Sequence, residues 1–332
     1  MDLLKKMIAE IQLNNKKGSG VMSLLLKMLR YISNSQYRFL INASLGRYNS
    51  MSDADYIKNI FKSTMGYELD LEEPKTFNEK LQWLKLHNRL SEYTPMVDKY
   101  LVRDYIAKEL GEKYLIPLLG VWENSDEIDF SKLPDKFVLK CNHNSGLGMC
   151  ICKDKSKLDF DQVRKDLNKG LRQDYYLYGR EWPYKNVKRR IIAEKYMEDG
   201  NGSNELTDYK FHCFNGFVDS VMVCSDRASG DTKFYFFDKD WNLKRYNIRG
   251  KNAPENFTIP KPDNMDEMFS IAEKLSQGLP FVRVDLYSIN NKTYFGELTF
   301  YPQSGFDANL LKETDEYWGN LIDLSIVKND CD

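Results

Sequence analysis

The feature that most constrains this chain is a predicted β-hairpin near its C-terminal end. Residues 281–287 and 294–300 are rich in apolar and aromatic side chains and flank a short polar loop, which is typical of two antiparallel strands. Because side chains alternate along a strand, Arg283 and Asp285 share one face, and the apolar residues between them share the other. A three-residue loop would place Asp285 directly opposite Glu297 on the second strand.

Two carboxylates that face each other in a bare sheet repel and destabilise it. A hard cation between Asp285 and Glu297 would reverse that balance, because Mg²⁺ is commonly held by one or two carboxylates and nucleotide phosphates. The alternative is a solvated sheet face on which Arg283 neutralises one acid. The hairpin by itself leaves both interpretations open.

A second candidate site is the turn after the strand that ends near Lys140. The turn contains Ser145, Gly146 and Gly148. Glycines let backbone amides approach an anion closely, and the lysine adds a point charge. The turn lacks the Gly-Lys-Ser/Thr sequence of a Walker A motif, and an ordinary hairpin turn is the alternative interpretation.

Two further strands carry polar residues that suggest a ligand. One ends in Glu194-Lys195-Tyr196-Met197, where backbone groups that leave the sheet can bind the edge of a purine. In the other, Asp208, Lys210 and His212 alternate onto one face, which favours water or a ligand opposite them. The alternatives are a strand that runs into a loop and an exposed sheet face.

Composition excludes several classes of protein. With 332 residues, the chain is long enough for about two domains, and its net charge of −1 is unusual for a generic nucleic-acid-binding protein. None of the six cysteines forms a Cys-x-x-Cys pair, and there are three histidines. This argues against a disulfide scaffold, a zinc ribbon or a multi-histidine metal site, and free thiols indicate a reducing cytoplasm.

The first 115 residues are predicted to be mainly helical, and the rest is richer in strands. Residues 22–41 are largely apolar but are interrupted by three basic residues, so a membrane span is not expected. A helix packed on the main body is one interpretation, and a basic amphipathic helix on a membrane surface is the other. Further helices are expected at 76–92, 96–110, 159–173 and 265–277. This order indicates an α+β fold rather than repeated βαβ units.

Taken in order along the chain, these motifs resemble the ATP-grasp superfamily, and more closely its branch named for teichuronopeptide biosynthesis (TupA-like), found in bacterial capsule and exopolysaccharide clusters. The resemblance covers about residues 50–320. The signatures that carry it are Pro74-Lys75-Thr76-Phe77-Asn78-Glu79-Lys80-Leu81-Gln82-Trp83, Asp98-Lys99-Tyr100-Leu101-Val102-Arg103 and residues 208–216. It implies an ATP-grasp fold, in which two α+β subdomains grip ATP between them, preceded by a mainly helical N-terminal region.

The resemblance also implies a division of the chain. We expect an N-terminal helical extension (1–50), a helical region before the ATP-grasp fold (51–115), a subdomain with the phosphate loop (116–197), a subdomain with the metal site (198–325) and a tail (326–332).

Individual roles follow from the same resemblance. The residues expected to bind ATP are Lys99, Lys140, Ser145, Gly146, Gly148, Glu194, Lys195 and Met197. The expected metal ligands are Asp285, Glu297 and Thr299, the last at a position where the superfamily usually has Asn. Lys210 and Arg283 are expected to be catalytic, and His143, Arg227 and Tyr301 to contact the substrate.

The implied function is an ATP-dependent ligase that joins a carboxylate to an amine or amino acid. The carboxylate is expected to belong to a uronic acid of a surface polysaccharide or its precursor, and to be activated as an acyl phosphate with release of ADP and phosphate.

The expected cofactors are ATP and Mg²⁺, with Mn²⁺ as a substitute, and no nucleic-acid partner is expected. The expected location is the cytoplasm, either free or at the inner face of the membrane through the N-terminal helix. Two alternatives stay open: a phosphotransferase acting on a sugar hydroxyl and a capsule-cluster glycosyltransferase.

Overall fold

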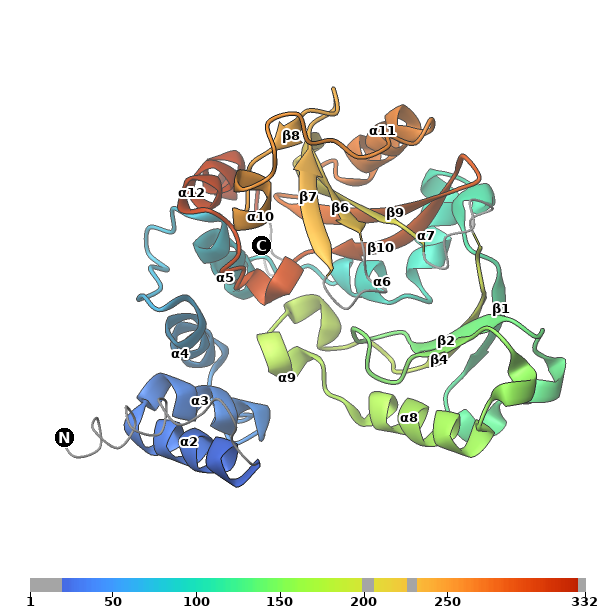
Figure 1. Ribbon diagram of the computed structural model, residues 1–332, viewed down its shortest axis with the longest axis horizontal. Coiled ribbons are helices and arrows are strands. Elements are labelled where there is room, and N and C mark those ends of the chain that lie inside the picture. Colours follow the sequence, from blue (N-terminus) through green and yellow to red (C-terminus); the bar gives the residue numbers. More distant parts are fainter. Residues whose placement is uncertain (1–19, 199–205, 226–231, 328–332) are drawn as a thin grey trace. The chain divides into compact units, whose positions relative to one another are not determined.

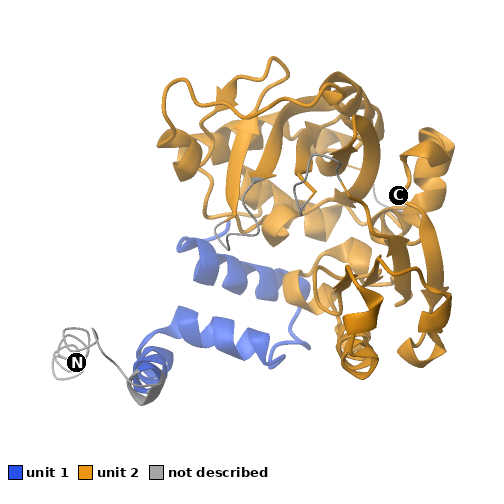
Figure 2. Ribbon diagram, turned by 45° about the vertical axis from the view of Figure 1, so that its right-hand side comes forward, with its two compact units in different colours: residues 1–69 blue, residues 70–332 orange. Residues whose placement is uncertain are grey.

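Two units of different size make up the chain, residues 1–69 and residues 70–332 (Figure 2). The computed structural model describes residues 20–198, 206–225 and 232–327. The smaller unit consists of helices α2 (Gly20–Ser33), α3 (Ser35–Ser44) and α4 (Asp53–Met65) in its described part. No helix among the described residues is long and apolar enough to cross a membrane.

Helix α2 overlaps the apolar segment 22–41, for which the sequence left two interpretations open. Its apolar side chains Leu25, Met28 and Ile32 are 47%, 56% and 67% exposed, and their spacing places them along one side of the helix.

The larger unit begins with three helices, α5 (Phe77–His87), α6 (Tyr93–Val97) and α7 (Val102–Glu109). The predicted continuous helix over 96–110 is therefore wrong. Asp98 interrupts it because its carboxylate accepts hydrogen bonds from the backbone amides of Tyr100 and Leu101, at 2.8 and 3.3 Å, and side-chain bonds of this kind compete with helical ones.

A four-stranded antiparallel sheet follows, in the order β1-β4-β2-β3 (Figure 1). Its strands are β1 (Leu118–Trp122), β2 (Phe137–Cys141), β3 (Cys150–Cys152) and β4 (Ile191–Lys195). Helix α8 (Phe160–Arg172) covers one face, where Val163 and Leu167 pack with Leu139 and Ala193. The short helix α9 (Tyr176–Gly179) precedes β4.

The second sheet has six antiparallel strands in the order β10-β9-β5-β6-β7-β8. The strands are β5 (Asp208–Phe214), β6 (Phe217–Ser225), β7 (Lys233–Phe237), β8 (Leu243–Lys244), β9 (Val282–Ile289) and β10 (Lys292–Thr299). Helix α11 (Met265–Leu275) covers one face, where Phe269 meets Phe211 edge-on at 5.1 Å between ring centroids. Helices α10 (Ile248–Lys251) and α12 (Lys312–Leu321) complete this part. Both sheets are antiparallel, which confirms the predicted α+β class.

Candidate active site

The predicted hairpin is present, and its register places Asp285 opposite Glu297 as expected. The route to that pairing differs from the prediction. The turn contains two residues, Asn290 and Asn291, with φ of 50° and 59°, and the register then shifts by one residue at Gly296. This bulge restores the pairing that a three-residue loop would have given.

Lys210 and Arg283 converge on the buried carboxylate of Asp285. Lys210 Nζ bonds to Asp285 Oδ2 and lies 3.5 Å from Asp208 Oδ2. The Arg283 guanidinium binds Asp285 through two bonds, from Nε to Oδ1 at 2.6 Å and from Nη2 to Oδ2 at 2.8 Å. Arg283 thus neutralises Asp285, as in the second interpretation of the hairpin, and protein cations lie beside both acids.

The same compensation fixes the charge states of the two cations. Burial by itself would lower the pKa of Lys210, but Asp285, with help from Asp208 and Glu297, raises it above the ordinary value. Burial also acts to lower the pKa of Arg283, and again Asp285 outweighs it and raises the pKa. Both side chains are therefore permanent positive charges on this face of the sheet.

Glu297 links this cluster to the other sheet. Its carboxylate lies 3.5 Å from Arg283 Nη2 through Oε1, and 3.7 Å from Lys99 Nζ through Oε2. Lys99 Nζ also donates to the carbonyl oxygen of Asn144, at 2.9 Å, inside the predicted phosphate loop. Lys99 therefore bridges the loop and the hairpin, which suits its expected place beside ATP phosphates.

The oxygen donors of Asp285, Glu297 and Thr299 are chemically suited to Mg²⁺. Thr299 Oγ1 lies 3.4 Å from Glu297 Oε1. Within the described residues, no group of three or more His, Cys, Asp or Glu side chains could hold a metal ion. Since Mg²⁺ is usually bound through one or two carboxylates together with substrate phosphates, this donor set fits a metal that a nucleotide helps to hold.

The predicted phosphate loop has an open tip and a packed base. Ser145 and Gly146 are exposed, and a Cβ on Gly146 would meet nothing within 4 Å. Gly148 has φ of +72°, and a Cβ there would lie 3.0 Å from the Cα of Gly170 on α8. The tip can therefore approach an anion, whereas Gly148 serves to pack the loop on the helix.

Lys140 and Glu194 form an ion pair on the face of the four-stranded sheet opposite α8. Lys140 Nζ lies 2.6 Å from Glu194 Oε2, and Arg103 Nη1 lies 3.7 Å from Oε1. Arg103 lies within one of the family signatures, but the sequence suggested no role for it.

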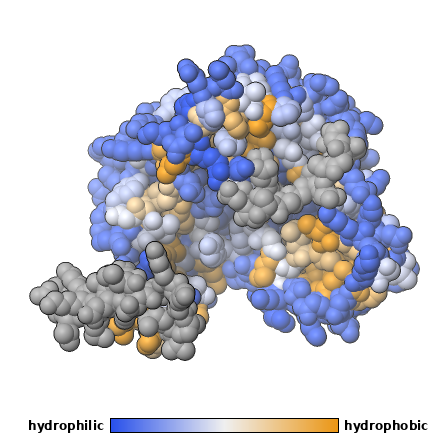
Figure 3. Space-filling model, in the orientation of Figure 1, coloured by the Kyte–Doolittle hydropathy of each residue, from blue (hydrophilic) through white to orange (hydrophobic). Residues whose placement is uncertain are grey.

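An apolar row lies on the same face of the sheet. Val138 is paired with Glu194 on one side and with Ile151, which is 52% exposed, on the other. Figure 3 shows apolar surface over this sheet.

At the end of β4, the backbone amide of Lys195 donates to the carbonyl oxygen of Pro117 at 2.9 Å. This N–H is therefore not available to a nucleotide. Met197 follows and is half-buried, so its backbone remains the better candidate for a purine edge.

The three predicted substrate residues have different outcomes. Tyr301 is 3% exposed and packs in the hydrophobic core, so its side chain is not available to a substrate. His143 is 2% exposed, and its Nε2 lies 3.1 Å from the carbonyl oxygen of Gln173, so it holds the loop in place. Arg227 lies outside the described residues.

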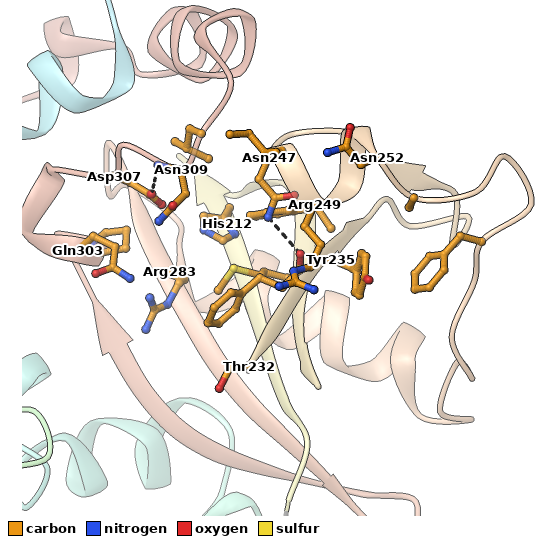
Figure 4. A pocket seen from close by; sticks show the side chains of 18 of the residues that line it. His212, Thr232, Tyr235, Asn247, Arg249, Asn252, Arg283, Gln303, Asp307 and Asn309 are labelled. Carbon is orange, nitrogen blue, oxygen red and sulfur yellow. Dashed lines mark hydrogen bonds between the residues drawn. The ribbon is translucent and has the colours of Figure 1, made fainter. Parts of the chain in front are cut away.

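Sequence reasoning missed a cavity of about 670 Å³ beside Arg283 (Figure 4). Polar side chains dominate one part of its wall, and Phe234, Tyr235 and Phe257 supply an aromatic part. The polar residues include Arg249, Asn252, Gln303, Asp307 and Asn309. These five residues come from two segments that are distant in the sequence, and of the side chains singled out in the sequence, His212 and Arg283 line this cavity.

His212 is a buried polar residue that lines this cavity. It is 4% exposed and stacks on Trp318, with ring centroids 4.6 Å apart, and its Nδ1 has no hydrogen-bond partner within the described part of the chain. Burial, followed by the charges of Arg283 and Lys210, holds its pKa well below 6.5. His212 is therefore a neutral hydrogen-bonding group in the cavity wall.

Comparison with known structures gives distant matches. A D-alanine–D-alanine ligase from Helicobacter pylori shares 16% identity at a TM-score of 0.39, over 74% of this chain and 68% of its own. A D-alanine–D-alanine ligase from Bacillus anthracis shares 16% identity at a TM-score of 0.40, over 70% of this chain and 66% of its own. A D-cycloserine synthetase shares 14% identity at a TM-score of 0.38, over 68% of this chain and 70% of its own. The chain thus spans about two thirds of the length of these ligases, and such distant matches carry no inference about its substrates. No curated protein matches the chain significantly.

A family model gives a much more extensive match. The TupA-like ATP-grasp model aligns with residues 79–323, which include both sheets and all of the charged residues described above. The match covers well over half of the chain and confirms the expected fold. This protein therefore belongs to the TupA-like ATP-grasp family.

Proposed function

We propose that this protein is an ATP-dependent ligase that activates a carboxylate as an acyl phosphate and couples it to an amine, releasing ADP and phosphate. The observation that carries the proposal is the cluster of Lys210, Arg283, Asp285 and Glu297, which Lys99 ties to a glycine-containing loop. Fixed charges of this kind stabilise phosphoryl transfer. Membership of the ATP-grasp family supports ATP as the phosphoryl donor.

The nucleotide would lie across the four-stranded sheet. The apolar row of Val138 and Ile151 offers a surface for the adenine ring, and Glu194 and the backbone at Met197 offer polar contacts at its edge. Lys140, together with the open tip at Ser145 and Gly146, would then contact the phosphates. Replacement of the ion pair between Lys140 and Glu194 by a lysine–phosphate contact is expected on binding.

Asp285, Glu297 and Thr299 would hold Mg²⁺, or Mn²⁺ in its place, and the metal would neutralise phosphate charge when bound. Lys210 and Arg283 are held in place by Asp285, so their charges are already oriented toward the phosphoryl group in transfer. A carboxylate oxygen of the substrate attacks the γ-phosphorus and ADP leaves. The amine then attacks the acyl carbon and phosphate leaves.

The carboxylate substrate would occupy the cavity beside Arg283. Its amides, its neutral His212 and its aromatic side chains suit a ring that carries hydroxyl groups, and its volume suits a ligand larger than a single amino acid. This supports a uronic acid of a surface polysaccharide or its precursor as the acid, with an amino acid or another amine as the nucleophile. Such a reaction belongs in the cytoplasm or at the inner face of the membrane, where ATP is present.

The proposal is tested by the fate of ATP and of the carboxylate oxygen. With uronic acids crossed against amines, the expected products are ADP and phosphate, and hydroxylamine should trap the intermediate as a hydroxamate. An ¹⁸O-labelled carboxylate should pass one labelled oxygen to phosphate. AMP and pyrophosphate would exclude the acyl-phosphate route, and ADP with a stable phosphorylated sugar would identify a phosphotransferase instead.

A further inference from the structure

One face of helix α5 carries three completely buried polar residues. Asn78, Gln82 and Lys85 are each 0% exposed, and their spacing of four and three residues aligns them along the helix. Below, they are called the polar stripe. They lie in or directly after the first signature of the family resemblance, and the proposed reaction gives them no role. Buried polar side chains are costly unless they are fully hydrogen-bonded, so their partners indicate what they do.

The polar stripe binds the backbone of residues 303–307, called the strap below. Gln82 Nε2 donates to the carbonyl oxygens of Ser304 and Gly305, at 3.2 and 2.5 Å. Asn78 Oδ1 accepts a hydrogen bond from the backbone amide of Asp307 at 2.8 Å. These contacts join residues more than 200 positions apart in the sequence.

Lys85 reinforces the same contact. Its Nζ donates to the carbonyl oxygens of Ser304 and Gly179, both at 2.7 Å, and to Gln82 Oε1 at 2.8 Å, which uses all three protons of the ammonium group. Ser304 Oγ also donates to Glu181 Oε1 at 2.6 Å. Side chains from α5 and from the segment after α9 therefore both bind Ser304.

The strap needs such support because its backbone is strained. Gln303, Ser304 and Gly305 have consecutive φ values of 51°, 53° and 65°, a conformation that residues with a Cβ rarely adopt. A Cβ on Gly305 would collide with the Gln82 side chain and approach Leu81 Cβ to 2.9 Å. The strap thus lies directly on α5, in a conformation that its own sequence does not favour.

The opposite side of the strap forms part of the cavity wall. Gln303 and Asp307 line the cavity, as does Arg283, and all three appear on the same side of the view in Figure 4. Burial raises the pKa of Asp307 above its ordinary value. A change in the strap would therefore move two polar groups beside the proposed catalytic arginine.

We propose that Asn78, Gln82 and Lys85 are positioning residues that hold the strap so that Gln303 and Asp307 face the cavity, and that they thereby set the affinity for the carboxylate substrate without touching it. The inference rests on the proposed function, in which the cavity holds that substrate.

Two variants and one control test the proposal. Lys85→Met removes the ammonium group, and Gln82→Glu keeps an acceptor for Lys85 while it removes both bonds to the strap. Lys80→Met is the matched control, because Lys80 lies on the same helix but donates to the carbonyl oxygen of Ile322 at 2.9 Å. Hydrogen–deuterium exchange of the strap amides is measured first, and then the KM values for glucuronic acid and for ATP in the hydroxylamine-trapping assay.

In both stripe variants, hydrogen–deuterium exchange of the strap amides should be about tenfold faster or more, and KM for glucuronic acid should rise by a similar factor. The reason is that each variant loses hydrogen bonds to a charged or buried partner. KM for ATP should stay unchanged, and the Lys80 control should match the wild type throughout. If Lys85→Met does not fold, Gln82→Glu decides by the same measurements.

Unchanged strap exchange in Gln82→Glu would overturn the positioning role. Faster exchange with an unchanged KM for glucuronic acid would overturn the link to substrate affinity. If the wild-type protein forms no hydroxamate from any uronic acid, the proposed function fails, whereas the exchange data still decide whether the stripe holds the strap.

Discussion

Lys140 is the residue whose replacement tests the nucleotide site most directly. Lys140→Ala should weaken ATP binding about tenfold or more, because a charge-assisted hydrogen bond contributes about 1.5–3 kcal/mol. Calorimetric titration with ATP measures the effect. Lys136→Ala is the control, since Lys136 pairs with Glu198 at an exposed position. Equal affinity in the two variants would remove Lys140 from the site.

Asp285 and Glu297 differ in burial, and this separates their effects on stability from their effects on catalysis. Asp285→Asn should abolish turnover and lower the free energy of unfolding by about 3–5 kcal/mol, because it leaves Lys210 and Arg283 buried without their carboxylate. Glu297 is more exposed, with 38% of its side chain accessible, so Glu297→Gln should abolish turnover with little loss of stability. Denaturant unfolding and ATP turnover are the two measurements.

Normal turnover in either variant would contradict the metal assignment. Thr299→Asn should retain activity, because it introduces the residue usual for the superfamily at that position.

At the scale of elements, the packing of the phosphate loop on α8 makes a prediction about two glycines. Gly146 and Gly148 both have positive φ, but a Cβ on Gly148 would meet α8 and one on Gly146 would meet nothing. Gly148→Ala should therefore cost more stability than Gly146→Ala, by about 1–3 kcal/mol. Thermal unfolding of the two variants provides the comparison. Equal losses would mean that the loop does not pack on the helix.

At the scale of the whole molecule, the three histidines make stability depend on pH in one direction. Burial is the main cause that lowers the pKa of His87, His143 and His212 below 6.5. A lowered pKa means that the unfolded chain binds more protons than the folded chain in mild acid, so these groups reduce stability as pH falls below about 6.5.

The effect of His212 can be isolated by substitution. His212→Gln should flatten the pH dependence of the unfolding free energy between about pH 5 and 6.5, where one such group contributes at most about 1.4 kcal/mol per pH unit. His87→Gln, at a more exposed position, should flatten it less. Urea unfolding across this range is the measurement, and an unchanged slope in His212→Gln would show that His212 gains no extra proton on unfolding.

The sequence by itself determined the faces of the strands and the order of the motifs. Alternation placed Asp208, Lys210 and His212 on one face of β5, and Arg283 and Asp285 on one face of β9, because a period of two is a local property of extended backbone. The family resemblance added the expected nucleotide contacts, and the helix expected over 76–92 is present as α5, which begins after a capping box formed by Thr76 and Glu79.

Only the tertiary structure decided which charges meet and which residues form the cavity beside Arg283. Two of these contacts join segments that are distant in the chain: the ion pair between Lys99 and Glu297, and the hydrogen bonds from Gln82 to the strap. Local periodicity cannot encode such contacts, because they exist only after the two sheets and α5 have packed together. For the same reason the sequence could show that Asp285 and Glu297 face each other, but not that Lys210, Arg283 and Lys99 already balance their charge.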